Sequence, residues 1–166
     1  MNKEDLLNYL SKKNFEYILF DHPPLYTVED SKKMRGKIEG VHSKNLFLKN
    51  KKNQFFLFSC EESTSVNLKN LGKSLNIGNI SFAKEEHLLE ILGVTPGSVT
   101  PFGLLNDKKK QVKFFLDKKI LIHKKVNFHP LENTSTITID VKKFVDLMIE
   151  NKKNVHVFDF DNYSII

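Results

Sequence analysis

Three short stretches of the chain carry residue types that fit a site for chemistry on a substrate. They are Lys44 in "SKNLFL", the segment Gly97 to Pro101 that reads "GSVTP", and His129 at the start of "HPLEN". The motifs of nucleotide-binding loops, serine hydrolases and zinc proteases are absent from the sequence. If the chain is an enzyme, these residues therefore indicate catalysis by positioning and electrostatics.

Each of the three stretches also has a purely structural interpretation. Alternation along a strand places Lys44 on the same face as Leu46 and Leu48, where a lysine either extends its ammonium group to solvent or turns inward to meet an anion or a carbonyl group. Glycine lets the backbone approach a ligand and proline stiffens a loop, so Gly97 to Pro101 is either a connector or a cradle of N–H donors. His129 stands beside Pro130 and is either structural or part of a polar site.

Composition places the chain among small globular proteins. With 166 residues and 14 Phe it has enough apolar material for one core, and we expect residues 1–166 to form a single domain. Cys60 is the only cysteine, and the six His include no close ligand pair, so we expect a core cysteine and neither a disulfide nor a metal. No apolar run approaches the roughly 20 residues that span a bilayer, and the first residues do not form a signal peptide. The expectation is a cytoplasmic protein without a membrane partner.

The charge balance favours a polyanionic partner. The formal net charge is +6, and Lys49, Lys51 and Lys52, Lys108 to Lys110, and Lys118, Lys119, Lys124 and Lys125 form clusters. Such clusters either follow a nucleic-acid backbone or are ordinary solvated turns. Composition alone leaves both interpretations open.

Periodicity predicts the elements that must position these residues. In the first half we expect a helix over 3–13 capped by Asn2, a strand at "EYILF", a helix from Thr27 to Gly36, a hairpin over 43–60, a helix through Leu68, Leu71 and Leu75, and a strand at "NISFA". A further helix, "KEEHLLEIL", should end at Gly93. The second half predicts strands at "QVKFFLD", "KILIH", "NTSTITI" and "NVHVFDF", with a helix capped by Asp140 after the third. This order favours an α+β fold with a central, largely antiparallel sheet or barrel.

The motifs taken together resemble one known superfamily. "DHPP" followed by "YTVED", then "GVHSKNLFL", "LGVTPGSVTPFGLLND" and "FHPLENTSTITI", occur in the order found in the YbaK and prolyl-tRNA synthetase editing domains. The sequence is most similar to the freestanding ProXp-ala (PrdX-type) trans-editing deacylases, which remove alanine mischarged onto proline tRNA. The resemblance covers nearly the whole chain and implies a YbaK-like mixed, largely antiparallel sheet or barrel surrounded by helices.

The resemblance also implies roles for particular residues. The essential lysine of the family falls on Lys44, its G-x-x-x-P loop on Gly97 through Pro101, and its histidine near the amino-acid pocket on His129. The resemblance and the residues beside these motifs give the substrate-binding set as Pro23, Tyr26, Asn45, Ser98, Thr100, Pro101, Phe102 and Asn133. Asn45 after the lysine agrees with the ProXp-ala branch and argues against the Cys-tRNA deacylases.

The function implied is hydrolysis of Ala-tRNA(Pro) without a metal or cofactor. Backbone N–H groups around Gly97 and Ser98 would stabilise the ester oxyanion, Lys44 would position the terminal nucleotide, and water would attack. The implied partners are the acceptor end of proline tRNA and, in some settings, prolyl-tRNA synthetase. Two alternatives stay open: deacylation of another mischarged tRNA carrying serine or cysteine, and a non-catalytic module that binds tRNA or a synthetase.

Overall fold

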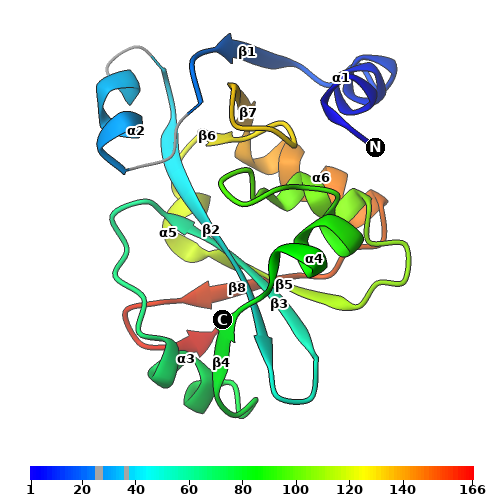
Figure 1. The fold of residues 1–166 in the computed structure, drawn as a ribbon. Helices are drawn as coiled ribbons and strands as arrows, with labels where there is room; N and C mark the ends of the chain where they lie inside the picture. The colour runs from blue at the N-terminus through cyan, green and yellow to red at the C-terminus, as the bar shows by residue number, and fades with distance from the viewer. Residues whose placement is uncertain (25–27, 36–37) are drawn as a thin grey trace.

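The computed structural model describes residues 1–24, 28–35 and 38–166, which build a mixed sheet with helices packed against it (Figure 1). The α-helices are α1 (Lys3–Lys12), α2 (Val28–Arg35), α3 (Leu68–Ser74), α4 (Glu85–His87), α5 (Lys118–Leu121) and α6 (Val141–Glu150), joined by a π-helix (Leu88–Leu92) and a 3-10 helix (Pro101–Leu105). The strands are β1 (Tyr17–Asp21), β2 (Val41–Asn50), β3 (Phe55–Glu61), β4 (Ile80–Phe82), β5 (Val112–Asp117), β6 (Lys125–Phe128), β7 (Ser135–Asp140), β8 (Val155–Asp159) and β9 (Ser164–Ile165).

The strand order is β1-β7-β6-β2-β3-β5-β8-β9, and β4 adds to β2. The pairs β2–β6, β3–β5 and β5–β8 are parallel, whereas β1–β7, β6–β7, β2–β3, β2–β4 and β8–β9 are antiparallel. This mixed, largely antiparallel sheet with helices around it confirms the predicted α+β fold class.

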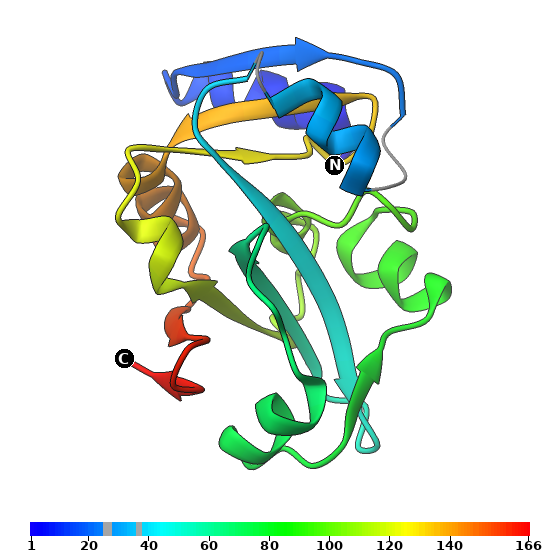
Figure 2. The same cartoon turned by 90° about the vertical axis from the view of Figure 1, so that its left-hand side faces the viewer.

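The long strand β2 joins the two halves of the sheet. Its first residues, Val41 and His42, pair with β6, while Ser43–Lys49 pair with β3 and its last residues pair with β4. Figure 2 shows β2 crossing the molecule diagonally, with β1, β6 and β7 around its upper end. Lys44 lies just after the point where β2 passes from one partner to the other.

Apolar side chains fill two clusters on opposite faces of the sheet. The larger cluster contains Phe47 of β2 and packs α1, α6 and the 3-10 helix against the sheet. The smaller one contains Leu48 of β2 together with Phe56, Phe58 and Cys60 of β3, and it is covered by α3. Neighbouring residues of β2 thus enter different clusters, which confirms that this hairpin is covered on both faces.

The predicted helix ends agree with the structure at several points. The Asn2 side chain accepts a hydrogen bond from the N–H of Asp5, and the Asp140 side chain accepts one from the N–H of Lys143. Gly93 has φ +67° and ends the helical segment, of which residues Leu88–Leu92 are π-helical. The expected helix boundaries at Thr27 and Gly36 lie outside the described residues.

The prediction of a strand at "KILIH" is wrong. This segment begins with the short helix α5, because the Asp117 side chain accepts a hydrogen bond from the N–H of Lys119 at 2.9 Å and so caps the helix. The strand follows at β6 instead. The chain also continues after β8 into the short strand β9, which the sequence pattern did not predict.

Candidate functional site

Lys44 is half-buried in β2, opposite Cys60 of β3. Its Nζ donates a hydrogen bond to the backbone carbonyl oxygen of Thr64. Among the residues described, no carboxylate forms an ion pair with this ammonium group. A cation that is partly removed from water and bonded to a neutral acceptor remains able to attract an anion or a carbonyl oxygen.

Cys60 beside it is a core residue. The thiol is fully buried, and this burial raises its pKa to about 12. Since a thiolate is the reactive form of cysteine, Cys60 is unsuited to act as a nucleophile at neutral pH. This agrees with the expectation that it belongs to the core.

Asn45 points to the opposite face of β2 from Lys44, as consecutive strand residues do. Its Oδ1 accepts a hydrogen bond from the hydroxyl of Ser59 on β3 at 2.5 Å. The side chain is half-buried, and its amide nitrogen has no hydrogen bond to a described residue. The two residues expected to act together therefore lie on different faces of one strand.

The Gly/Pro stretch contains a type II β-turn formed by Thr95, Pro96, Gly97 and Ser98. The N–H of Ser98 donates to the carbonyl oxygen of Thr95 at 3.1 Å, and Gly97 has φ +86°. A type II turn favours proline at its second position and glycine at its third, where φ is positive. The unusual composition of this stretch is thus explained first by a tight turn at an exposed position.

The turn restricts which N–H groups can serve a substrate. The N–H of Ser98, expected as one oxyanion donor, is already bonded within the turn. The N–H groups of Gly97 and Val99 make no hydrogen bond to another residue in the described part of the chain. Among the described residues, the N–H groups of Gly97 and Val99 are therefore available as donors, whereas that of Ser98 is not.

The last residue of the turn and the residues that follow it enter the core. Ser98, Thr100, Pro101 and Phe102 are all buried, and the Thr100 side chain accepts a hydrogen bond from the N–H of Phe102 at the start of the 3-10 helix. The Phe102 ring is fully buried and lies edge-on to Phe128 at 6.1 Å between ring centroids. Phe102 is therefore a core residue beneath the loop. It would influence a substrate pocket only indirectly, by supporting the residues that line it.

His129 follows directly after β6 and is held through one ring nitrogen. Its Nδ1 lies 3.0 Å from the carbonyl oxygen of Ser135, which requires Nδ1 to carry the proton. Burial lowers the pKa of His129, the hydrogen bond to Ser135 opposes this, and nearby His22 lowers it further. At neutral pH the ring is thus uncharged, and Nε2 carries a lone pair with no hydrogen-bond donor among the described residues.

His22 of "DHPP" supports the same region. It is buried, its Nε2 lies 2.8 Å from the hydroxyl of Thr136, and its ring centroid lies 6.4 Å from that of His129. Pro23 is exposed, and its carbonyl oxygen lies 2.8 Å from His22 Nδ1. Asn133 is half-buried in the turn between β6 and β7, while Tyr26 lies outside the described residues.

Strand β6 links the start of β2, His129 and the end of the loop through backbone pairing and core packing. The parallel pairing of β2 with β6 ends at His42 and Asn127, two residues before Lys44 and His129. Lys44 shares a sheet face with Cys60 of the smaller cluster, whereas Phe102 and Phe128 belong to the larger cluster. The contact of Phe102 with Phe128 fastens the end of the loop to the residue before His129. Figure 1 shows the loop between residues 93 and 100 near the upper half of β2, on the side away from α2.

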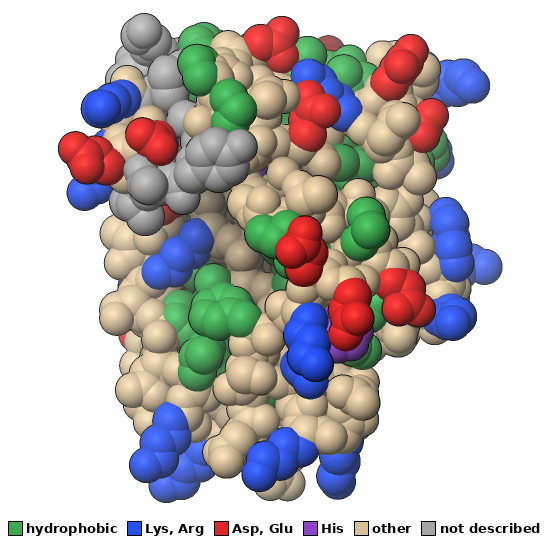
Figure 3. All heavy atoms as spheres, in the orientation of Figure 1, with side chains coloured by type: hydrophobic (Ala, Val, Ile, Leu, Met, Phe, Trp, Pro, Cys, Tyr) green, Lys and Arg blue, Asp and Glu red, His purple; other side chains and the backbone are tan. Residues whose placement is uncertain are grey.

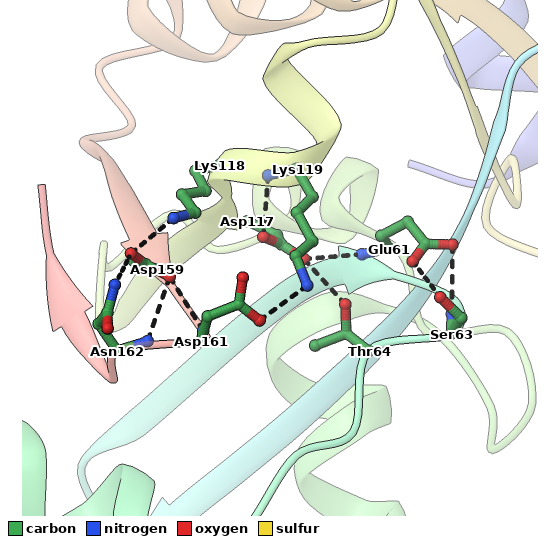
Figure 4. A network of polar contacts seen from close by, with 9 residues as sticks. All are labelled: Glu61, Ser63, Thr64, Asp117, Lys118, Lys119, Asp159, Asp161 and Asn162. Carbon is green, nitrogen blue, oxygen red and sulfur yellow. Dashed lines mark hydrogen bonds and ion pairs between the residues drawn. The ribbon is translucent and has the colours of Figure 1, made fainter.

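The lysine clusters differ in how far they are neutralised. Lys118 and Lys119 form ion pairs with Asp159 at 2.6 Å and with Asp161 at 2.8 Å (Figure 4). Exposed lysines surround the β2–β3 turn and α3, and Figure 3 shows basic side chains along this lower edge. A cavity of about 260 Å³ on another part of the surface is lined by Lys110, Lys113, Lys152 and Lys153. Of the predicted clusters, the one at Lys118 is therefore the least available to phosphates.

The described residues contain no helix long and apolar enough to cross a membrane. They also contain no group of three His, Cys, Asp or Glu side chains arranged to hold a metal ion. Two residues near Lys44 were not expected from the sequence: Thr64, whose carbonyl oxygen accepts from Lys44, and Asp117, which accepts from the hydroxyl of Thr64. No motif marks them, and only the position of Asp117 at the end of an apolar strand hinted at a capping role.

Comparison with known proteins gives a consistent result. A family model described as "Aminoacyl-tRNA editing domain" matches residues 22–147. The chain is 35% identical to Prolyl-tRNA synthetase associated domain-containing protein 1 of Xenopus laevis, over 96% of this chain and 97% of that protein. It is 34% identical to the prolyl-tRNA editing protein ProX of Acetoanaerobium sticklandii, over 86% of this chain and 90% of that protein.

A solved structure supports the fold independently. A crystal structure titled as a candidate trans-editing enzyme for prolyl tRNA synthetase superposes with a TM-score of 0.69 and covers 92% of this chain and 93% of its own. Its sequence identity is 18%, so this match concerns the fold alone.

Proposed function

The chain belongs to the aminoacyl-tRNA editing domain family, and from this premise we propose that it is a trans-editing deacylase that hydrolyses Ala-tRNA(Pro). The editing proteins of this family act on tRNA, and one relative is named a prolyl-tRNA editing protein. We further propose that residues 1–166 act as one editing domain on cytoplasmic tRNA, alone or beside prolyl-tRNA synthetase.

The observation that carries the proposal is the placement of Lys44. Its half-buried ammonium group has no carboxylate partner among the described residues and is bonded to the neutral carbonyl oxygen of Thr64. A lysine that only interacts with solvent does not need a half-buried ammonium group. A lysine that binds the phosphate of a terminal nucleotide does need one held in a fixed position.

The chemistry needs only modest assistance because an aminoacyl ester is already activated. Water adds to the ester carbonyl, the negative charge on its oxygen is stabilised by N–H groups such as that of Gly97, and the ribose oxygen then leaves and takes up a proton. The neutral Nε2 of His129 is available to accept a hydrogen bond from the attacking water or from the amino group of the substrate. No metal or cofactor takes part in this scheme.

Selectivity for alanine follows from a size limit. A pocket built for proline would reject alanine weakly, because one methylene changes binding by only about 1–3 kcal/mol. A separate pocket too small for the prolyl ring excludes the correct product sterically. Pro23, Tyr26, Asn45 and Asn133 are proposed to contribute to the walls of this pocket.

The test is deacylation of proline tRNA charged separately with alanine, serine, cysteine and proline. We expect rapid loss of alanine, slow loss of proline, and for Lys44→Ala a fall of about a hundredfold that leaves a measurable rate well above the uncatalysed one. If every ester is lost at the background rate, the chain is not a deacylase and the alternative of a non-catalytic binding module is favoured. If serine or cysteine is lost preferentially, the substrate is the tRNA that carries that amino acid. The exposed Lys73→Ala is a matched control that should keep the wild-type rate.

A further inference from the structure

We propose that Thr64 and Asp117 are positioning residues that fix the Lys44 ammonium group before the substrate arrives. The proposal rests on the proposed function for the role of Lys44. Its structural basis is a continuous chain of hydrogen bonds, from the Asp117 carboxylate through the hydroxyl of Thr64 to a peptide carbonyl that receives Lys44 Nζ.

Asp117 lies at the end of β5 and is fully buried. Its Oδ2 accepts from the N–H of Glu61 at 3.1 Å and from the hydroxyl of Thr64 at 3.2 Å, and its Oδ1 accepts from the N–H of Lys119 at 2.9 Å (Figure 4). The parallel pairing of β3 with β5 brings this carboxylate to the end of β3. One buried anion therefore fixes both the start of α5 and the turn that follows β3.

Thr64 is buried at the end of that turn. Its N–H donates to the carbonyl oxygen of Glu61 at 2.9 Å, and its hydroxyl is held by Asp117. The direction of its own carbonyl is fixed in this way, and Lys44 Nζ donates to it. One of the three N–H groups of the ammonium is then engaged, and the other two are left in a defined orientation.

The charges around Cys60 are consistent with this short path. Burial is the main cause of its raised pKa, Lys44 acts against it, and Asp117 adds to it. Both the cation and the anion are therefore close enough to this thiol to influence it. The ammonium group of Lys119 is directed to Asp161 at 2.8 Å, so the Asp117 carboxylate is held by hydrogen bonds from neutral groups.

This arrangement lowers the loss of side-chain entropy when Lys44 binds a substrate. A free lysine side chain has many rotamers and loses this freedom when it binds a ligand. An ammonium group held by a fixed carbonyl has lost much of that freedom during folding. We expect this fixed position of the ammonium group to raise kcat more than it lowers KM. The reason is that stabilisation of the transition state depends more strongly on the position of the charge than binding of the ground state does.

The first test is Thr64→Val, which removes the hydroxyl and keeps the size and the carbonyl. We expect kcat for Ala-tRNA(Pro) to fall about tenfold, as for loss of one buried hydrogen bond, with KM changed by less than about twofold. Thr64→Ser should restore the rate. Ser63→Ala is the matched control, because this hydroxyl lies in the same turn and, within the described part of the chain, bonds Glu61 alone. Its rate should stay within about twofold of wild type.

A double-mutant cycle separates positioning from general damage. In a Lys44→Ala background, Thr64→Val should have no further effect on the residual rate, since both changes remove the same function. A wild-type rate for the folded Thr64→Val protein would overturn the proposal, and so would a further tenfold loss in the Lys44→Ala background. Asp117→Asn, which keeps the shape of the carboxylate, should lower kcat in the same direction as Thr64→Val.

A measurement without substrate keeps this proposal separate from the proposed function. In proton–nitrogen NMR spectra of lysine ammonium groups, Lys44 should give a slowly exchanging signal, assigned by its loss in Lys44→Ala, and Thr64→Val should broaden or remove it. If this holds while the wild type hydrolyses no ester, the deacylase function fails and the positioning of Lys44 stands. If the signal is unchanged in Thr64→Val, the positioning proposal is overturned whatever the activity.

Discussion

Replacement of Gly97 by alanine should affect both the stability of the fold and the reaction. Gly97 has φ +86° at the third position of its turn, where a residue with a Cβ costs about 1–2 kcal/mol. For a chain of this size each kcal/mol corresponds to about 2–4 °C in the melting temperature, so we expect a decrease of about 2–8 °C. Alanine keeps the backbone N–H, but the strained φ should displace the turn and misalign this proposed oxyanion donor, so kcat should fall by about tenfold or more.

Gly78 provides a control for the backbone effect. It has φ +77°, and a Cβ added there would meet no atom within 4 Å. Gly78→Ala should therefore lower the melting temperature by a similar amount and leave the deacylation rate unchanged. Gly97→Asn should recover part of the loss, since asparagine tolerates positive φ. A Gly97→Ala enzyme with the wild-type rate, or an equal loss of rate in Gly78→Ala, would refute an oxyanion role for this turn.

Three further predictions concern other parts of the molecule. Burial lowers the pKa of His129 below 6.5, so kcat should be constant above about pH 7 and fall as the pH drops through the lowered pKa. The stability of the fold should also decrease as the pH falls below the pKa of this histidine in the unfolded chain, because the unfolded chain binds the proton more readily. A pH–rate profile that falls already above pH 7 on acidification would contradict this. Asp140→Ala removes the cap of α6 and should cost about 1 kcal/mol in denaturant unfolding, whereas Asp140→Asn should cost less. Phe144→Ala opens a cavity at a fully buried ring and should cost about 3–5 kcal/mol; a loss below about 1 kcal/mol would refute its place in the core.

The local features of this fold were readable from the sequence because neighbouring residues determine them. The caps at Asn2 and Asp140, the helix end at Gly93 and the alternation around Phe47 depend on a few adjacent positions. The Gly/Pro stretch was correctly identified as unusual. Its geometry as a type II turn also follows from "TPGS", a more specific structure than the connector or cradle that we expected.

The features that were missed depend on contacts distant in the sequence. The helix α5 replaced an expected strand because Asp117 caps it, and apolar residues such as Ile120 are compatible with both structures. The link from Asp117 to Thr64 and Lys44 arises from the pairing of β5 with β3 and of β3 with β2. Since these residues are separated by many positions, no spacing in the sequence indicates that they meet.

The position of β1 has a consequence for synthesis on the ribosome. This strand is made well before its partner β7, to which it pairs through Tyr17 and Ile139. Strand β2 likewise awaits β6, through Val41 and Val126. Such late pairing is typical of slow folding and leaves early strands exposed to other chains in the meantime. We therefore expect nascent chains stopped before β6 to lack the pairing of β2 with β6 and to be prone to aggregation, so the proposed site is completed only after β6 and β7 have been made.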